Sequence, residues 1–137
     1  MDIDITREEL DAGAVLVQTR GEVDVYTAPK WRAFVREVAE DDKVRHVGLD
    51  LAGVHFFDST ALGCLVACWR WFLAAGGEHP GVFALVALEE EVAKIMRITG
   101  MERIFTIAAT REDFEGLVAA HEGQAEACGS QVDRDCA

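Results

Sequence analysis

The chain has 137 residues, 50% of them hydrophobic, which is enough for one domain with an ordinary core. Its formal net charge is −12. This acidic balance disfavours nucleic acids and anionic membranes as partners, because both attract basic surfaces. A protein with a basic patch is the more natural partner.

No targeting or membrane segment is evident in the sequence. Residues 1–4 lack the basic start and apolar run of a signal peptide. No run approaches the roughly 20 apolar residues of a membrane span. These features predict a cytoplasmic protein.

Hydrophobic periodicity and turn residues predict the order of the elements. Strands are expected over residues 3–8, 13–19, 44–51, 82–87 and 104–107, and helices over 28–40, 59–75, 89–99 and from 110 to about 121. Single helices between strands imply crossover connections and parallel pairing, whereas the first two strands form an antiparallel hairpin. The predicted fold class is α/β, with a small mixed β-sheet of four to five strands and four helices packed mainly on one face.

The C-terminal segment differs in composition from the rest of the chain. Residues 122–137 are rich in Gly, Gln, Ala, Ser and acidic residues, and lack aromatic residues and periodicity. The sequence therefore predicts one domain over residues 1–121, followed by a flexible acidic tail over 122–137.

The helix expected over residues 59–75 is apolar on more than one side. Its predicted core stripe consists of Leu62, Leu65, Val66, Trp69 and Leu73. The opposite side carries Thr60, Cys64, Cys68, Trp71 and Ala75, and Arg70 is the only charged residue of the helix. Two interpretations stay open: another element covers this side, or it is an exposed strip, with Cys64 and Trp71, that contacts a partner.

Two polar segments stand where a strand leads into a helix. One is Asp58-Ser59-Thr60, and the other is Gly21-Glu22-Val23-Asp24 with Thr27. Asp, Ser and Thr are favoured helix N-caps, and a phosphate added at such a place meets a favourable dipole. If the two preceding strands are parallel, both segments lie at one edge of the sheet. One partner surface with Asp24, Asp58, Ser59 and Thr60 is therefore predicted. For Asp24 a second interpretation stays open, in which its side chain stabilises the turn by bonding its own backbone.

Patterns typical of enzymes are absent from the sequence. His55, Asp58 and Ser59 are too close along the chain to form a catalytic triad, and there is no glycine-rich phosphate loop. The four histidines are scattered singly, and the four cysteines form neither a C-x-x-C pair nor a zinc pattern. No catalytic residue, cofactor or metal site is predicted.

The two polar segments resemble the STAS domain, in particular the bacterial anti-sigma factor antagonists. That family carries a G-E-[LIV]-D segment before its first helix and D-S-[ST]-G-[LIV]-G at its second, which match residues 21–24 and 58–63 here. Ala61 stands where the family usually has glycine. Residues 41–51 and 98–105 are also similar, so the resemblance covers about residues 3–120.

This resemblance implies a regulatory protein rather than an enzyme. The expected partner is an anti-sigma factor that is also a serine kinase, which phosphorylates the residue matching Ser59; a serine phosphatase reverses the modification. The unmodified form would bind the anti-sigma factor and release a sigma factor. The alternative is a STAS interaction module of another signalling complex that is not regulated by phosphorylation.

Overall fold

The computed structural model describes the backbone of residues 3–130 and the side chains of residues 3–123. Its five strands form one sheet in sequence order: β1 (Ile3–Glu9), β2 (Ala14–Val23), β3 (His46–Phe57), β4 (Phe83–Val86) and β5 (Thr106–Ala108). β1 pairs antiparallel with β2, and every other neighbouring pair is parallel. The predicted mixed sheet is confirmed.

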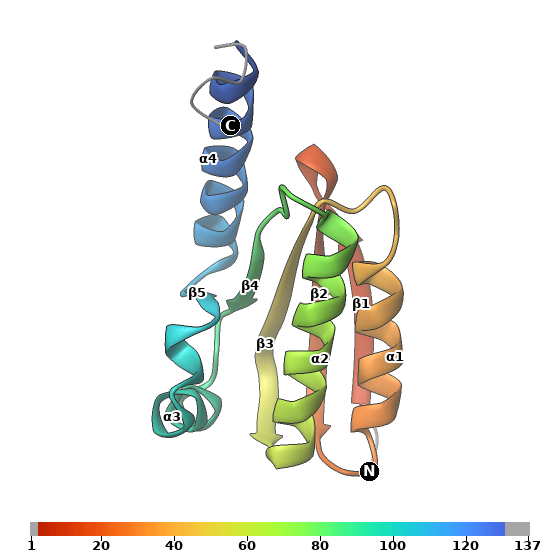
Figure 1. Ribbon diagram of the computed structural model, residues 1–137. Helices are drawn as coiled ribbons and strands as arrows, with labels where there is room; N and C mark the ends of the chain where they lie inside the picture. Colours follow the sequence, from red (N-terminus) through yellow and green to blue (C-terminus); the bar gives the residue numbers. More distant parts are fainter. Residues whose placement is uncertain (1–2, 131–137) are drawn as a thin grey trace.

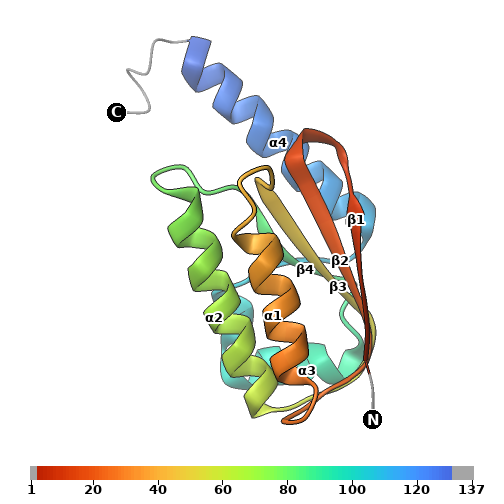
Figure 2. The same ribbon diagram turned by 90° about the vertical axis from the view of Figure 1, so that its right-hand side faces the viewer.

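The helices form a layer on each side of the sheet, and they are unequally divided. α1 (Ala28–Ala39), α2 (Ser59–Gly76) and α3 (Glu90–Thr99) lie on one face, whereas α4 (Arg111–Ser130) packs on the other (Figures 1 and 2). The prediction that the helices pack mainly on one face is therefore confirmed.

The larger core fills the space between the sheet and the first three helices. Trp31 of α1 is fully buried there, and its ring meets the edge of Phe57 from β3 at a centroid distance of 5.8 Å. The Trp31 indole N–H donates to the Thr19 hydroxyl at 3.1 Å. A buried indole donor needs such a partner, so this bond fixes α1 on β2.

A smaller core joins α4 to the opposite face. Phe114 and Val118 of α4 cover apolar residues of β2, β4 and β5. Gly48 of β3 lies directly beneath Phe114, where an added Cβ atom would be 2.9 Å from the ring. Arg111 at the start of α4 binds the carboxylate of Glu8 on β1. The absence of a side chain at Gly48 lets the aromatic ring approach the sheet.

Two strands are longer than predicted. β2 continues to Val23 and β3 to Phe57, where the predictions ended at residues 19 and 51. The Ala52-Gly53 segment has the composition of a break, but the two strands stay paired past it, with register shifts between Gln18 and Arg20 and between Gly21 and Glu22. Such β-bulges absorb an extra residue without ending the pairing.

The sequence analysis assigned the wrong side of α2 to the core. The fully buried residues of α2 are Ala61, Leu65, Cys68 and Phe72. Of the predicted stripe only Leu65 is among them; Leu62, Val66, Trp69 and Leu73 are partly buried and pack around the core. The helix is apolar nearly all round, so periodicity could not define which side faces the sheet.

The boundary predicted between domain and tail falls inside α4. The helix runs to Ser130, and the Glu122 carboxylate lies 2.6 Å from His46 of β3. Residues 122–130 therefore continue the helix that was expected to end at about residue 121, and the division into a domain and a flexible tail stays a prediction. A helix of this composition depends on its neighbours more than on its own periodicity. Residues 131–137 lie outside the described residues.

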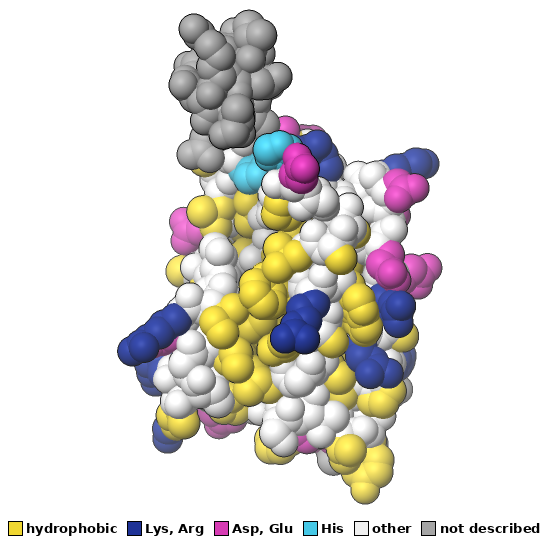
Figure 3. All heavy atoms as spheres, in the orientation of Figure 1, with side chains coloured by type: hydrophobic (Ala, Val, Ile, Leu, Met, Phe, Trp, Pro, Cys, Tyr) yellow, Lys and Arg dark blue, Asp and Glu magenta, His cyan; other side chains and the backbone are white. Residues whose placement is uncertain are grey.

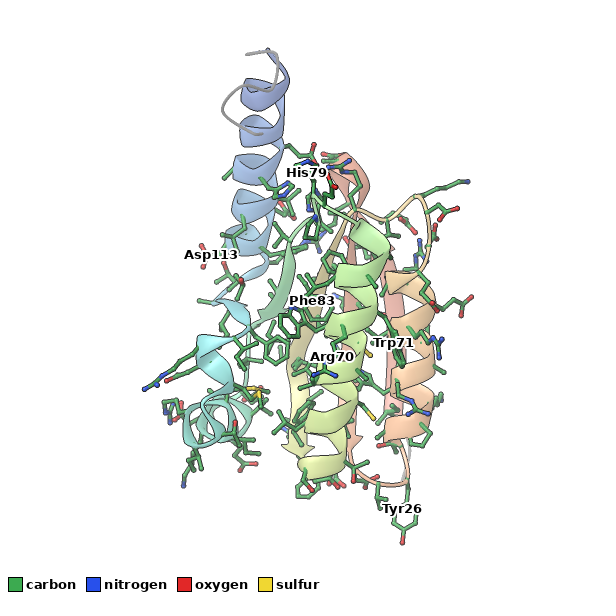
Figure 4. All side chains as sticks on the ribbon, in the orientation of Figure 1. Tyr26, Arg70, Trp71, His79, Phe83 and Asp113 are labelled. Carbon is green, nitrogen blue, oxygen red and sulfur yellow. The ribbon has the colours of Figure 1, made fainter. Side chains whose placement is uncertain are left out.

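By length and composition alone, α2 is also apolar enough to cross a membrane. Core helices of globular domains meet the same criteria, and α2 here packs against α1 and the sheet. Its outward side leaves a broad hydrophobic area between α1 and α3, interrupted by Arg70 (Figures 3 and 4).

The close approach of the α2–β4 loop to β3 generates a prediction about stability. A Cβ atom on Gly81 would lie 1.9 Å from the Arg45 carbonyl oxygen, a backbone atom that cannot rotate away. Gly81→Ala should lower the free energy of unfolding by about 1–3 kcal/mol or more, the range for overpacking. Chemical denaturation would measure this.

Gly63→Ala is the matched control. Gly63 lies on α2 with no atom within 4 Å of its added Cβ, so the same change there should stabilise the helix by up to about 1 kcal/mol. Equal effects of the two substitutions would contradict the assigned close approach.

Candidate functional site

The N-terminus of α2 is formed by Asp58. Its backbone is extended, and its carboxylate Oδ1 accepts the N–H of Ala61 at 2.9 Å, which is an N-cap. The Asp58 N–H in turn donates to the carbonyl of Val23 at the end of β2, at 3.3 Å. Asp58 therefore joins three elements at this point: the ends of β2 and β3 and the start of α2.

Ser59 and Thr60 are the first two residues of α2, and both are exposed. Neither hydroxyl has a hydrogen-bond partner among the described residues. The free N–H groups of the first helical turn point in the same direction. An anion attached to Ser59 would therefore meet the positive end of the helix dipole. The predicted position of Ser59 at a strand-to-helix junction is confirmed.

Asp24 lies in the neighbouring loop, but the residue is buried, with 8% of its surface exposed. Its Oδ1 accepts the N–H groups of Tyr26 at 2.9 Å and Thr27 at 3.0 Å. These bonds lower the pKa of Asp24, and the N–H of Thr27 makes the largest contribution. Asp24 therefore shapes the loop from inside, as an Asx turn does, rather than presenting its carboxylate at the surface.

Thr27 has the residue type of a helix N-cap, but its side chain makes other contacts. It precedes α1, yet its side chain caps no helical N–H. Its hydroxyl donates to the Glu22 carbonyl at 2.6 Å and accepts the Asp24 N–H at 3.0 Å. The Asp24 and Thr27 side chains together hold the backbone of residues 22–27 in one shape.

The sequence analysis missed the apolar side chains that this loop exposes. Tyr26 is 85% exposed, Val25 54% and Phe56, near the end of β3, 48%. Tyr26 projects from the same end of the molecule as the start of α2 (Figure 4). Large exposed apolar residues grouped in this way are typical of protein interaction sites. The available signal in the sequence was the pair Val25-Tyr26, two large side chains between a strand and a helix.

Cys64 and Trp71 lie on the α1 side of α2 and are both half-buried. The Trp71 ring packs under the guanidinium of Arg36 from α1, with 4.3 Å between the Arg36 Cζ and the ring centroid. The strip predicted on this side of α2 is therefore partly covered. Its member Cys68 is fully buried.

Burial also determines the chemistry of the cysteine thiols in α2. It raises the pKa of Cys64 and raises that of Cys68 to about 12. Both are therefore protonated thiols rather than nucleophilic thiolates at neutral pH. Their role in this fold is packing.

The structure thus brings Asp24, Asp58, Ser59 and Thr60 to one end of the sheet, whereas Cys64 and Trp71 lie further along α2 (Figure 4). The surface that we call the Ser59 surface consists of Val25, Tyr26, Phe56, Ser59 and Thr60, with Asp24 and Asp58 supporting it. It has an exposed hydroxyl, exposed apolar groups and a helix N-terminus. These features suit recognition by a protein and modification of a serine.

Comparison with known proteins identifies the family and the fold of this chain. Residues 6–114 match the sequence model of the STAS domain. The chain is 29% identical over 119 residues to the anti-sigma-B factor antagonist of Listeria monocytogenes, covering 85% of this chain and 97% of that protein. It is 30% identical over 112 residues to the anti-sigma-B factor antagonist of Bacillus subtilis, covering 82% of this chain and 94% of that one.

A solved structure has the same fold. The crystal structure of an anti-sigma factor antagonist from Mycobacterium paratuberculosis superposes with a TM-score of 0.74 at 26% identity, covering 85% of this chain and 94% of that one. The chain belongs to the STAS domain family, among the anti-sigma factor antagonists. Proteins of this group are regulatory rather than catalytic.

The buried carboxylate of Asp24 generates a prediction about pH. Asp24 has a folded-state pKa below its ordinary value of 3.8, so its ionised form stabilises the fold above that pH, and the stabilisation is lost as the pH falls through the lowered pKa. Asp24→Asn should therefore melt below wild type at pH 7, and the gap should shrink below about pH 3.8. Thermal melts across this range would measure it.

Asp50→Asn is a suitable control, since Asp50 is a half-buried carboxylate that accepts a single local backbone N–H, from Ala52. A gap between wild type and Asp24→Asn that is the same at pH 3 and pH 7 would contradict the structural role of the Asp24 charge.

Proposed function

We propose that this protein is a cytoplasmic, phosphorylation-controlled partner switch. In its unmodified form it binds an anti-sigma factor through the Ser59 surface, and the sigma factor held by that partner is released. The partner is a serine kinase that transfers phosphate from ATP to Ser59, which ends binding, and a serine phosphatase restores the unmodified form. The protein itself is the substrate and not an enzyme.

The observation that carries this proposal is the position of Ser59. Its hydroxyl is exposed and unbonded at the first position of α2, and exposed apolar side chains lie in the loop beside it. A kinase can reach this hydroxyl without any rearrangement of the fold. The names of the relatives, which are anti-sigma factor antagonists, support an anti-sigma factor as the partner.

A phosphate on Ser59 would change the surface more than the fold. It adds about −1.5 to −2 charges at neutral pH. The helix dipole and the free first-turn N–H groups favour this charge, while the Asp58 carboxylate opposes it. A closely docked partner must in addition desolvate the phosphate or exclude its volume, which costs more than a typical contact contributes.

The alternative function is a STAS interaction module of another signalling complex, without phosphorylation. The same Ser59 surface would then bind its partner through Tyr26 and the other exposed apolar groups. The two functions differ in whether a kinase modifies Ser59.

Ser59 variants test the switch. Ser59→Ala should resist phosphorylation and bind the anti-sigma factor persistently, while Ser59→Asp should bind at least about tenfold more weakly, because that factor corresponds to only about 1.4 kcal/mol. Affinities for the partner, measured by calorimetry with and without ATP, would check this. Phosphosite mapping by mass spectrometry identifies the modified hydroxyl.

Thr60→Ala is the matched control, because Thr60 is the adjacent exposed hydroxyl. It should be phosphorylated and released as wild type is. Equal affinity of the phosphorylated and unphosphorylated forms, or a phosphate found solely on Thr60, would refute the mechanism.

Tyr26 tests the location of the partner surface. Because Tyr26 is 85% exposed, Tyr26→Ala should leave the melting temperature nearly unchanged. The same change should weaken partner binding by more than about 1 kcal/mol, since a tyrosine at the centre of an interface is a frequent hot spot. Ile98→Ala, on α3, is the control, because that side chain is also apolar and 73% exposed. Partner binding that depends on Ile98 and not on Tyr26 would place the interface elsewhere.

A further inference from the structure

At the opposite end of β3 from the Ser59 surface, two histidines that are far apart in the sequence meet. His46 begins β3 and is fully buried, and His121 comes from α4; their rings lie edge to face, with centroids 5.1 Å apart. Glu122 is the third member of this cluster. Histidine side chains lie together at this end of the molecule, beside α4 (Figure 3).

Hydrogen bonds fix the protonation of the His46 ring. Its Nδ1 accepts the backbone N–H of Val82 at 2.9 Å, so Nδ1 carries no proton. The proton of the neutral ring is therefore on Nε2, which donates to the Glu122 carboxylate oxygen Oε1 at 2.6 Å. This same oxygen lies 3.3 Å from the Arg45 Nε.

The His121 ring has the opposite arrangement. Its Nε2 lies 3.1 Å from the carbonyl oxygen of Pro80, which can only accept, so Nε2 carries the proton. Its Nδ1 then presents a lone pair. That atom is buried and has no partner among the described residues. A buried polar atom without a partner is costly, so this nitrogen requires a partner such as a water molecule or an ion.

We propose that His121 and Glu122 form a binding site for a divalent transition-metal ion such as Zn²⁺. The His121 Nδ1 and the Glu122 carboxylate would be the protein ligands, and water would complete the coordination. His46, His121 and Glu122 each have one potential ligand atom within 4.8 Å of those of the other two. A single ion can therefore contact both His121 and Glu122 after a small adjustment of their side chains.

The surroundings of His121 and Glu122 are those of metal ligands. A ligating histidine almost always donates its other ring N–H to a carboxylate or a backbone carbonyl, and His121 donates to Pro80. A ligating carboxylate is likewise held by a hydrogen bond, and His46 supplies it to Glu122. The Arg45 guanidinium is a competing cation, but it is near Oε1 and leaves the other oxygen available.

His46 acts in this site as a positioning residue and not as a ligand. To coordinate through Nε2 the neutral ring would have to move its proton to Nδ1, where the Val82 N–H already points. That tautomer would place two donors against each other. His46 therefore orients the Glu122 carboxylate.

The test is titration of the untagged chain of 137 residues with ZnCl₂ by calorimetry. Wild type should bind one ion, and its melting temperature should rise with Zn²⁺ concentration, because a ligand of the native state stabilises it. His121→Gln should abolish this saturable binding. His55→Gln is the control, since it removes an exposed imidazole near the other end of β3.

His46→Gln separates positioning from a general structural role. It should weaken Zn²⁺ binding by about 10–100-fold, as loss of a supporting hydrogen bond does. A purely structural role would lower the melting temperature without metal while the affinity of the folded protein for Zn²⁺ stays unchanged.

Three results would overturn the proposal. The first is the absence of saturable Zn²⁺ binding, in which case a buried water satisfies the His121 Nδ1. The second is wild-type binding by His121→Gln. The third is a Co²⁺ spectrum of the bound protein with thiolate-to-metal charge-transfer bands, which would assign the ion to cysteines.

Discussion

The parallel pairing of β2 with β3 is the constraint on which the Ser59 surface depends. The two strands stay paired, through two register shifts, up to the pair Val23 and Phe57. The Asp58 N–H then donates to the Val23 carbonyl. β2 and β3 therefore end on the same side of the sheet. β2 leads into the loop with Asp24, and β3 leads into α2. A different register would separate these two segments and bury or expose the wrong residues.

The element order and the place of Ser59 could be predicted, because the signals for them are local. A carboxylate followed by small hydroxyl residues identifies a helix start, and Asp58 caps α2 as this chemistry requires. The rule for parallel crossovers then brings the two polar segments together. The choice between a surface carboxylate and a turn-stabilising one at Asp24 could not be made in this way. It depends on the Thr27 side chain, which folds back to the Glu22 carbonyl and turns the carboxylate inward.

Other features depend on contacts between distant segments. The phase of α2 is set by which of its many apolar residues meet α1 and the sheet, and the small Ala61 and Cys68 occupy that side. The pairing of His46 with Glu122 joins positions 76 residues apart and exists only because α4 docks behind β3. A single histidine in a sequence does not indicate which distant residue its side chain will contact.

The length of β3 keeps the two ends of the molecule apart. From His46 to Phe57 the strand has 12 residues, which at about 3.3 Å per residue places its ends roughly 35 Å from each other. Effects at sites separated by much more than about 10 Å and sharing no partners are normally additive. Coupling between them would require an element with two arrangements that both sites bias. The buried bonds of Trp31 and Asp24 hold α1 and its loop in a single arrangement on the sheet. Under the proposed function, a change of charge at Ser59 would therefore act through the Ser59 surface itself, while the cluster around His46 contributes to how firmly α4 is held on the sheet.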